Sequence, residues 1–351
     1  MSLSSPFIHQ SKTTAQVMAL VCLALLPAIA VQFYYFGAFI LINLTICSLS
    51  ALLFESLIMY LRKRPILGTI SDNSALLTGL LLGLALPPLL PFWMSILAVL
   101  FAIVFAKHLY GGLGYNPFNP AMIGYVVLLI SFPAEMSAWL PSNEIATKVP
   151  GFTEAVQLIF TGSNNQQNTV IDYRLLADGF TMATPIDQLR AGLHQAKLIS
   201  EISNDSHFTA GLVYWQWLNI AFLTGGVFLL FSKIVRWQIP FSFLFGILIT
   251  SGLLYLYDDQ AYASPLFHLL TGATMMGAFF IATDPVTAST TPKGRIIYGL
   301  SIGFLIVIIR VFGGYPDAVA FAVLLLNIAV PTIDHYTKPV IYGHNKGDID
   351  E

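Results

Sequence analysis

Long apolar runs, each of about 20 residues and most of them followed by a polar turn, recur along almost the whole chain. A helix of that length crosses the ~30 Å hydrocarbon layer of a membrane. Water is absent from that layer, so only helices and closed barrels satisfy every backbone N–H and C=O group there. Hydrophobic residues make up 56% of the chain and charged residues 10%, whereas soluble domains carry roughly 25% charged residues. We therefore predict an all-α polytopic membrane protein.

The apolar runs fall into two groups on either side of a long polar stretch. The third run is too short to cross the membrane as one helix, because Pro87 and Pro88 end it. We predict about ten transmembrane helices, at 16–35, 38–60, 74–86, 93–106, 118–138, 213–232, 239–257, 265–283, 296–312 and 316–334.

The positions of lysine and arginine predict how the chain crosses the membrane. With the N-terminus inside, most of the 16 lysines and arginines fall on predicted inner segments, as the positive-inside rule requires. Both termini are therefore predicted to be cytoplasmic and the long polar loop to be periplasmic. The expected organisation is a first five-helix repeat at 1–138, the loop at 139–212, a second five-helix repeat at 213–338 and a cytoplasmic tail at 339–351.

The two groups of runs resemble each other. The segment 76–83, Leu-Leu-Thr-Gly-Leu-Leu-Leu-Gly, recurs loosely at 269–277, and Tyr-Gly-Gly at 110–112 is echoed by Phe-Gly-Gly at 312–314. Because each group has five runs, an odd number, the second copy would be inverted, and interrupted helices in inverted repeats point to a site near the midplane. The alternative is that Leu-Thr-Gly is simply common in membrane helices, where small residues allow close packing.

Several classes of function are excluded by composition and motif. The net charge of −2 lacks the excess of basic residues that is typical of nucleic-acid-binding proteins. The two cysteines, Cys22 and Cys47, lie in apolar runs and cannot supply four thiolates to an iron–sulfur cluster. No phosphate-binding loop, dinucleotide fingerprint or metal-type Cys/His spacing is present, so we predict no metal site. The first apolar run lacks signal-peptide features and is interpreted as a retained span.

One short motif stands in the long polar loop. The segment 178–184 reads Asp-Gly-Phe-Thr-Met-Ala-Thr and resembles the signal at which flavin transferases attach FMN, through its phosphate, to the last threonine. Thr184 is the predicted attachment residue, and Asp178, Gly179, Thr181 and Ala183 complete the motif. The following proline prevents a helix from running through the acceptor. The alternative is an ordinary surface loop rich in glycine and threonine.

A second candidate site lies in the turn between the fourth and fifth runs. Asn116 and Asn119 follow a glycine-rich stretch, and each amide offers donors and an acceptor to the edge of a flat ligand. Lys107 would offset negative charge on a reduced ring. The alternative is a tight turn whose asparagines cap the next helix.

Ionisable residues within or near the ends of predicted spans are further candidates. Glu55, His268 and Asp334 belong to this group, although their side chains could also reach the interface by snorkelling. Asp284 could close a helix end, bind a cation or pair with Lys293 or Arg295. Arg310 is expected to pair with Asp317.

With these motifs the chain resembles the family that contains the D subunit of the Rnf electron transport complex and the B subunit of the sodium-pumping NADH:quinone reductase. The resemblance covers nearly the whole length and has one departure, His9, which is expected directly after a proline. It extends over 5–9, 76–88, 116–121, 178–184, 284–286, 313–317, 327–334 and 338–344.

The resemblance implies an inner-membrane subunit of a complex that couples electron transfer between ferredoxin and NAD to ion movement. It implies covalent FMN on Thr184, a second covalent FMN on the G subunit, and riboflavin in the membrane part, for which Asn116, Asn119 and Lys107 are the expected contacts. The partners would be the A, B, C, E and G subunits, together with a maturing flavin transferase. The fold would be similar to that of urea and ammonium channels. The chain alone would have no complete catalytic activity.

Two other classes of function compete with this interpretation. A solute channel or secondary transporter would suit an inverted repeat but would have no use for the motif at 178–184. A purely structural subunit would scaffold the complex without carrying electrons.

Overall fold

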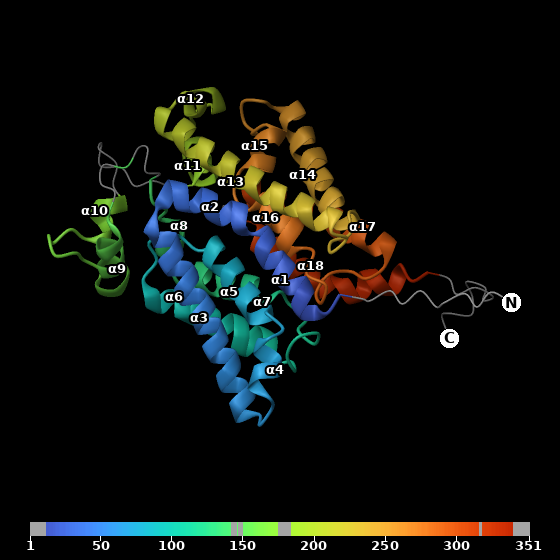
Figure 1. Cartoon of the computed structure of the whole chain (residues 1–351). Coiled ribbons are helices and arrows are strands. Elements are labelled where there is room, and N and C mark those ends of the chain that lie inside the picture. The colour runs from blue at the N-terminus through green and yellow to red at the C-terminus, as the bar shows by residue number, and fades with distance from the viewer. Residues whose placement is uncertain (1–11, 142–145, 147–149, 175–183, 316–317, 340–351) are drawn as a thin grey trace.

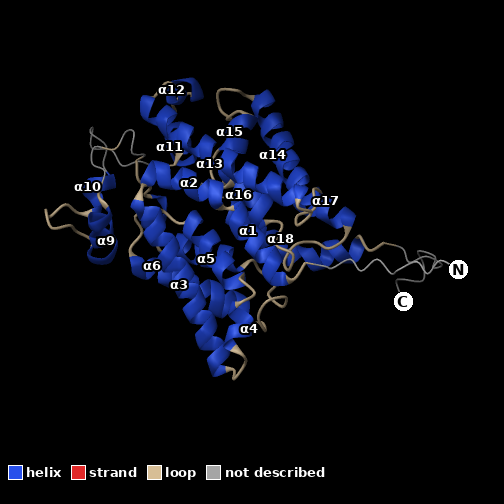
Figure 2. Ribbon diagram, in the orientation of Figure 1, coloured by secondary structure: helices blue, strands red, loops and turns tan. Residues whose placement is uncertain are grey.

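The computed structural model describes residues 12–141, 146, 150–174, 184–315 and 318–339. Helices make up most of these residues, and no strand is present among them (Figure 2). The prediction of an all-α chain is therefore confirmed.

The first half of the chain contains helices of very different lengths, and two of its apolar segments are built from consecutive helices (Figure 1). Its helices are α1 Thr14–Ala24, α2 Leu26–Phe36, α3 Ala38–Leu61, α4 Ile66–Ile70, α5 Ser74–Ala85, α6 Phe92–Leu100, the π-helix η1 Phe101–His108, α7 Pro120–Ser131 and α8 Pro133–Ser137.

The polar stretch carries four short helices, and the second half follows it. In Figure 1, α9 to α12 lie on the opposite side of the bundle from the C-terminal end of α18. The helices are α9 Phe152–Thr161, α10 Val170–Arg174, α11 Pro185–His194, α12 Ile199–Ser203, α13 Ser206–Phe231, α14 Gln238–Tyr257, α15 Pro265–Leu270, α16 Thr274–Met276, the π-helix η2 Gly277–Ile281, α17 Pro292–Phe312 and α18 Val319–Tyr336.

Six helical segments among the described residues are long and apolar enough to cross a membrane. Three further apolar helices are shorter: Ser74–Ala85, Phe92–His108 and Pro120–Ser131. The six longer segments are Thr14–Phe36, Ala38–Leu61, Phe208–Phe231, Gln238–Tyr257, Pro292–Phe312 and Val319–Tyr336.

The predicted run at 265–283 is interrupted, as expected from its likeness to the third run: it is divided into α15, α16 and η2 with a break at 271–273. The predicted run at 118–138 is also interrupted: α7 ends at Ser131, just before Pro133 opens α8. A proline lacks the N–H that a continuing helix needs. The fourth run extends further than predicted, since η1 continues to His108. α13 begins at Ser206, earlier than the expected boundary at 212.

Side-chain amides from neighbouring helices bind carbonyl groups at two helix breaks, one at the end of the third run and one in the run at 265–283. Gln32 in α2 donates to the Leu84 carbonyl near the end of α5, at 3.1 Å. Asn219 in α13 donates to the carbonyls of Leu270 and Gly272 at the end of α15, at 3.1 and 3.0 Å. Buried carbonyls without partners are costly in hydrocarbon, so these amides stabilise helix ends that would otherwise be untenable there.

The two halves pack directly on each other. α1 and α2 contact α13, and α7 contacts α18. Gly225 in α13 lies so close to α1 that an added Cβ would collide with the carbonyl of Ala24. Small residues at such positions let the backbones of membrane helices approach closely, so the two halves are tightly packed where α1 meets α13.

Candidate functional site

A cavity of about 130 Å³ lies at the seam between the two halves. Its walls come from α1, α5, the η1–α7 turn, α13 and η2, and they are mainly apolar. The polar side chains among its lining residues are Ser74, Thr78, Lys107, Asn116, Asn119, Thr283 and Asp284. The structure thus brings together the three residues predicted from the sequence as ligand contacts, and adds Asp284 from the other half. We call this space the seam cavity.

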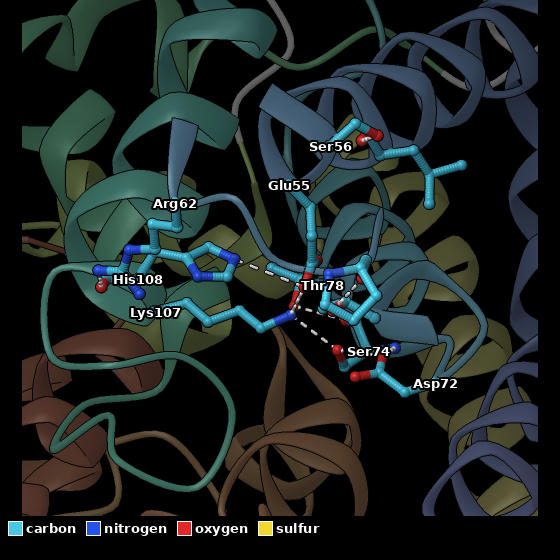
Figure 3. A network of polar contacts seen from close by, with 11 residues as sticks. Glu55, Ser56, Arg62, Asp72, Ser74, Thr78, Lys107 and His108 are labelled. Carbon is cyan, nitrogen blue, oxygen red and sulfur yellow. Dashed lines mark hydrogen bonds and ion pairs between the residues drawn. The ribbon is translucent and has the colours of Figure 1, made fainter. Parts of the chain in front are cut away.

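Lys107 is held by a buried ion pair beside the seam cavity (Figure 3). Its Nζ atom donates to Oε1 and Oε2 of Glu55 at 2.7 and 2.8 Å. Glu55 is 0% exposed and Lys107 2%, so both charges are removed from solvent and each depends on the other. The prediction that Lys107 lies in the inner turn is wrong, because η1 extends through it and buries it. Glu55 does not snorkel to the interface.

The same ammonium group also contacts Ser74, another lining residue of the seam cavity. Lys107 Nζ donates to Ser74 Oγ at 2.7 Å, and Ser74 Oγ donates to Asp72 Oδ1 at 2.5 Å. His108 adds its Nε2 atom 3.5 Å from Glu55 Oε1. Figure 3 shows these side chains converging from α3, α5 and η1. We refer to Glu55, Ser74, Lys107 and His108 as the charged cluster.

Both π-helices of the described residues border the seam cavity. Lys107 belongs to η1, and Phe279 and Phe280 belong to η2. In η1 the Leu109 N–H donates to the Val104 carbonyl five residues earlier, at 2.9 Å. Such wider turns shift side chains relative to a regular α-helix and are frequent at functional sites. No sequence signal predicted them.

The two asparagines of the turn have different roles. Asn119 is the N-cap of α7: its Oδ1 accepts from the Met122 N–H at 3.2 Å, so the capping alternative is confirmed for this residue. Its amide also donates to the Ile281 carbonyl at 3.4 Å and thereby joins the halves. Asn116 donates to the Phe118 carbonyl at 3.0 Å, and its buried Oδ1 has no hydrogen-bond partner. Asn116 is therefore the better placed of the two to accept a bond from a ligand.

Asp284 closes the turn after η2 on the opposite wall of the seam cavity. Its carboxylate accepts from the Val286 N–H at 3.2 Å and from Thr287 Oγ1 at 3.0 Å. Burial raises the pKa of the Asp284 carboxyl above its usual value, and the two hydrogen bonds oppose that rise. Among the described residues no ion pair joins it to Lys293 or Arg295, so the predicted pairing is not seen, and its hydrogen bonds close the turn after η2.

Thr184 opens α11 on the far side of the molecule. It is the N-cap residue: its Oγ1 accepts from the Asp187 N–H at 3.2 Å and donates to Asp187 Oδ2 at 2.7 Å. Pro185 occupies the first helical position, where its missing N–H costs nothing. The other motif residues, Asp178, Gly179, Thr181 and Ala183, lie outside the described residues.

Thr184 lines a second cavity of about 230 Å³. Four aromatic side chains, those of Tyr125, Trp139, Trp215 and Tyr315, are among its lining residues. The indole rings of Trp139 and Trp215 pack edge to face with centroids 5.0 Å apart. We call this space the aromatic cavity. No local pattern pointed to it, because its residues are far apart in the chain.

Two further ionisable candidates, Asp334 and Arg310, have structural partners. Asp334 accepts from Ser289 Oγ and from the N–H and hydroxyl of Thr290, which fixes the turn before α17. Arg310 is buried and donates to the carbonyls of His268 and Thr271, so it stabilises the break after α15. The expected partner Asp317 lies outside the described residues.

The helices, the seam cavity and the buried charged cluster define a class, the polytopic helical membrane proteins with ionisable groups held inside the bundle. Comparison with known proteins makes the assignment specific. The chain belongs to the NQR2, RnfD, RnfE family, whose model matches residues 1–343. The family resemblance inferred from the motifs is thereby confirmed.

Curated relatives cover almost the entire chain. One is the D subunit of the ion-translocating oxidoreductase complex of Escherichia coli (strain SMS-3-5 / SECEC), 53% identical over 348 residues, which are 98% of each chain. The protein of the same name from Escherichia coli O81 (strain ED1a) is 52% identical over 346 residues, again 98% of each chain.

Proposed function

We propose that the chain is the membrane-embedded, flavin-carrying D subunit of an ion-translocating oxidoreductase complex. The full-length identity to proteins of that name supports the assignment. The observation that carries the flavin role is the position of Thr184, a motif threonine whose hydroxyl lies at a helix N-terminus and lines a cavity with aromatic walls.

Thr184 and its surroundings fit a flavin phosphoester. The N-terminus of α11 favours a phosphate, because its first N–H groups and the helix dipole point toward that position. The tryptophans and tyrosines of the aromatic cavity offer faces and edges to a flat ring. Asp187 opposes a phosphate by its charge but holds the free hydroxyl in place before modification. FMN, when attached, supplies one-electron chemistry.

The seam cavity is the proposed site of riboflavin. Asn116 offers a buried acceptor without a partner, and Lys107 supplies a positive charge on the same wall. The apolar lining from α1, α5 and η2 would exclude water from a bound ring. Lys107 remains paired with Glu55, so the cavity keeps its charge balance before any ligand enters.

The finer topology is part of the same proposal: about ten membrane segments in two inverted five-helix repeats, as in urea and ammonium channels, with cytoplasmic termini and the Thr184 loop in the periplasm. The matched amides support it, since Gln32 and Asn219 each serve the interrupted segment of their own half. The expected setting is the bacterial inner membrane, with the A, B, C, E and G subunits and a flavin transferase as partners and ferredoxin and NAD as the electron couple.

Covalent flavin is the decisive test. The full chain is expressed with an active flavin transferase, separated on a denaturing gel and illuminated with ultraviolet light. A fluorescent band and one FMN increment in intact mass are expected, and both disappear in Thr184→Ala. Thr169→Ala, which removes an exposed hydroxyl from the same polar stretch, keeps both signals. A dark band for the unmodified chain, while the transferase labels another substrate, would refute the flavin role.

Non-covalent flavin is tested separately. Riboflavin released by denaturing the purified Thr184→Ala chain should be near stoichiometric and should fall by about tenfold in Asn116→Ala, as for loss of a hydrogen bond in a buried site. Asn165→Ala, an exposed asparagine, is the matched control. Equal riboflavin content in both variants would remove Asn116 from the site.

A further inference from the structure

A third cavity, of about 170 Å³, is lined by basic and apolar side chains. It lies between α11, the turn before α15, α15 itself and α17. Arg190 and His194 come from α11, His268 from α15 and Arg310 from α17. We call it the basic cavity. None of the proposed flavin chemistry uses it, because Thr184 lines the aromatic cavity and not this one.

Two of its basic side chains have polar atoms without partners. His268 is only 4% exposed, and its Nδ1 atom has no hydrogen-bond partner. Arg190 donates through Nη2 to the Gly313 carbonyl, while its buried Nη1 has none. Leaving such groups unsatisfied costs free energy. A ligand that accepts hydrogen bonds would remove that cost.

The charge of the cavity specifies the sign of the ligand. Both arginines are always protonated, and no described lining residue carries a carboxylate. Asp187, which is on the same helix as Arg190, lines the aromatic cavity and accepts from Thr184. The basic cavity is therefore suited to an anion.

The geometry of the donors and walls narrows the class of anion. A guanidinium fork matches the oxygens of phosphate or carboxylate. The other lining residues include Leu189, Leu193, Phe267 and Val311, which would accommodate the carbon atoms attached to a phosphate ester. We propose that the basic cavity binds a phosphate-bearing anion, held by Arg190 and His268, with the Arg310 charge beside them. The source is either an anionic phospholipid headgroup or free phosphate.

The test uses the full chain purified without flavin transferase, so that its outcome is independent of flavin attachment. Native mass spectrometry after addition of phosphatidylglycerol or phosphatidylcholine measures lipid binding, and thermal unfolding with inorganic phosphate measures binding of the free ion. Retention of one phosphatidylglycerol in preference to phosphatidylcholine would identify the lipid. A phosphate-dependent rise in melting temperature without lipid selectivity would identify the free ion.

Substitutions then test whether the ligand that binds, lipid or free phosphate, occupies the basic cavity. Arg190→Gln should weaken it at least about tenfold, as expected for loss of a charge-assisted hydrogen bond. Arg190→Lys keeps the positive charge but loses the planar guanidinium, so it should weaken binding less. This variant replaces the first one if Arg190→Gln folds poorly. Lys197→Gln removes an exposed charge from the same polar stretch and should leave binding unchanged. Equal binding by Arg190→Gln and Lys197→Gln, or no binding of either probe, would overturn the proposal.

Discussion

The charged cluster and the Thr184 region satisfy their polar groups in opposite ways. Glu55 and Lys107 are 52 residues apart and meet only because α3, α5 and η1 pack together. Thr184 and Asp187 are three residues apart and would meet in any helix that begins at this position. The charged cluster therefore depends on the packing of the whole bundle, whereas the contact between Thr184 and Asp187 is local and depends only on a short stretch of sequence.

The largest effect is expected at the charged cluster. Glu55→Gln leaves the Lys107 ammonium buried without its partner, which should lower the free energy of unfolding by about 3–5 kcal/mol. Thermal unfolding in detergent measures the change, and Glu201→Gln, an exposed acid, should change it by less than about 0.5 kcal/mol. The double variant Glu55→Gln/Lys107→Met should recover at least half of the loss. Equal losses in the single and double variants would contradict the electrostatic explanation.

The next largest losses of stability are expected at the two helix breaks bound by Asn219 and Gln32, and the two losses should differ in size. Asn219→Ala removes an amide that contacts three carbonyls, two of them at the break, and also an acceptor for the Met275 N–H. The expected loss is about 2–3 kcal/mol. Gln32→Ala removes one hydrogen bond, to Leu84, for about 1 kcal/mol. Unfolding of each variant is compared with that of Asn204→Ala, an exposed asparagine. A larger loss for Gln32→Ala would show that the two breaks do not depend on these amides.

Substitutions of Asn119 test whether a local helix cap also stabilises the wall of the seam cavity. Asn119→Ala removes the N-cap of α7 and the bond to Ile281, and should cost about 1–2 kcal/mol. Asn119→Asp keeps the capping oxygen and should recover the larger part. If the two substitutions are equally destabilising in thermal unfolding, the cap is not the stabilising element.

The smallest effect on stability is expected at Thr184. Thr184→Val removes the N-cap of α11 at a cost of about 1 kcal/mol, and Thr184→Ser keeps it. Amide hydrogen exchange should show faster exchange confined to the first turn of α11 in the valine variant. Faster exchange in α3 or η1 would show that the Thr184 region and the charged cluster are coupled, and would contradict the conclusion that the Thr184 contact is local.

Much of the fold could be predicted because the signals for it are local. Each predicted run corresponds to helix in the structure, and Pro87 and Pro88 end the third one as expected. The eighth run, which the repeat pattern predicts to be interrupted, does break at 271–273. The sequence did not show how that break is completed, because Asn219 comes from another helix. Lys107 was placed in a turn because charge usually lies outside spans; the partner that allows its burial, Glu55, was noted separately but not paired with it.

Hydrophobic length, helix-breaking residues and the 178–184 motif are properties of neighbouring residues, and they alone established an all-helical membrane chain of this family with Thr184 as its candidate attachment residue. Only the packed bundle decided that Lys107, Asn116 and Asp284 line one cavity and that Trp139 and Trp215 line another with Thr184. The physical reason is that side chains from distant segments bury a charge or enclose a cavity. Those segments come together only when all the helices of the bundle pack, which no short stretch of sequence determines.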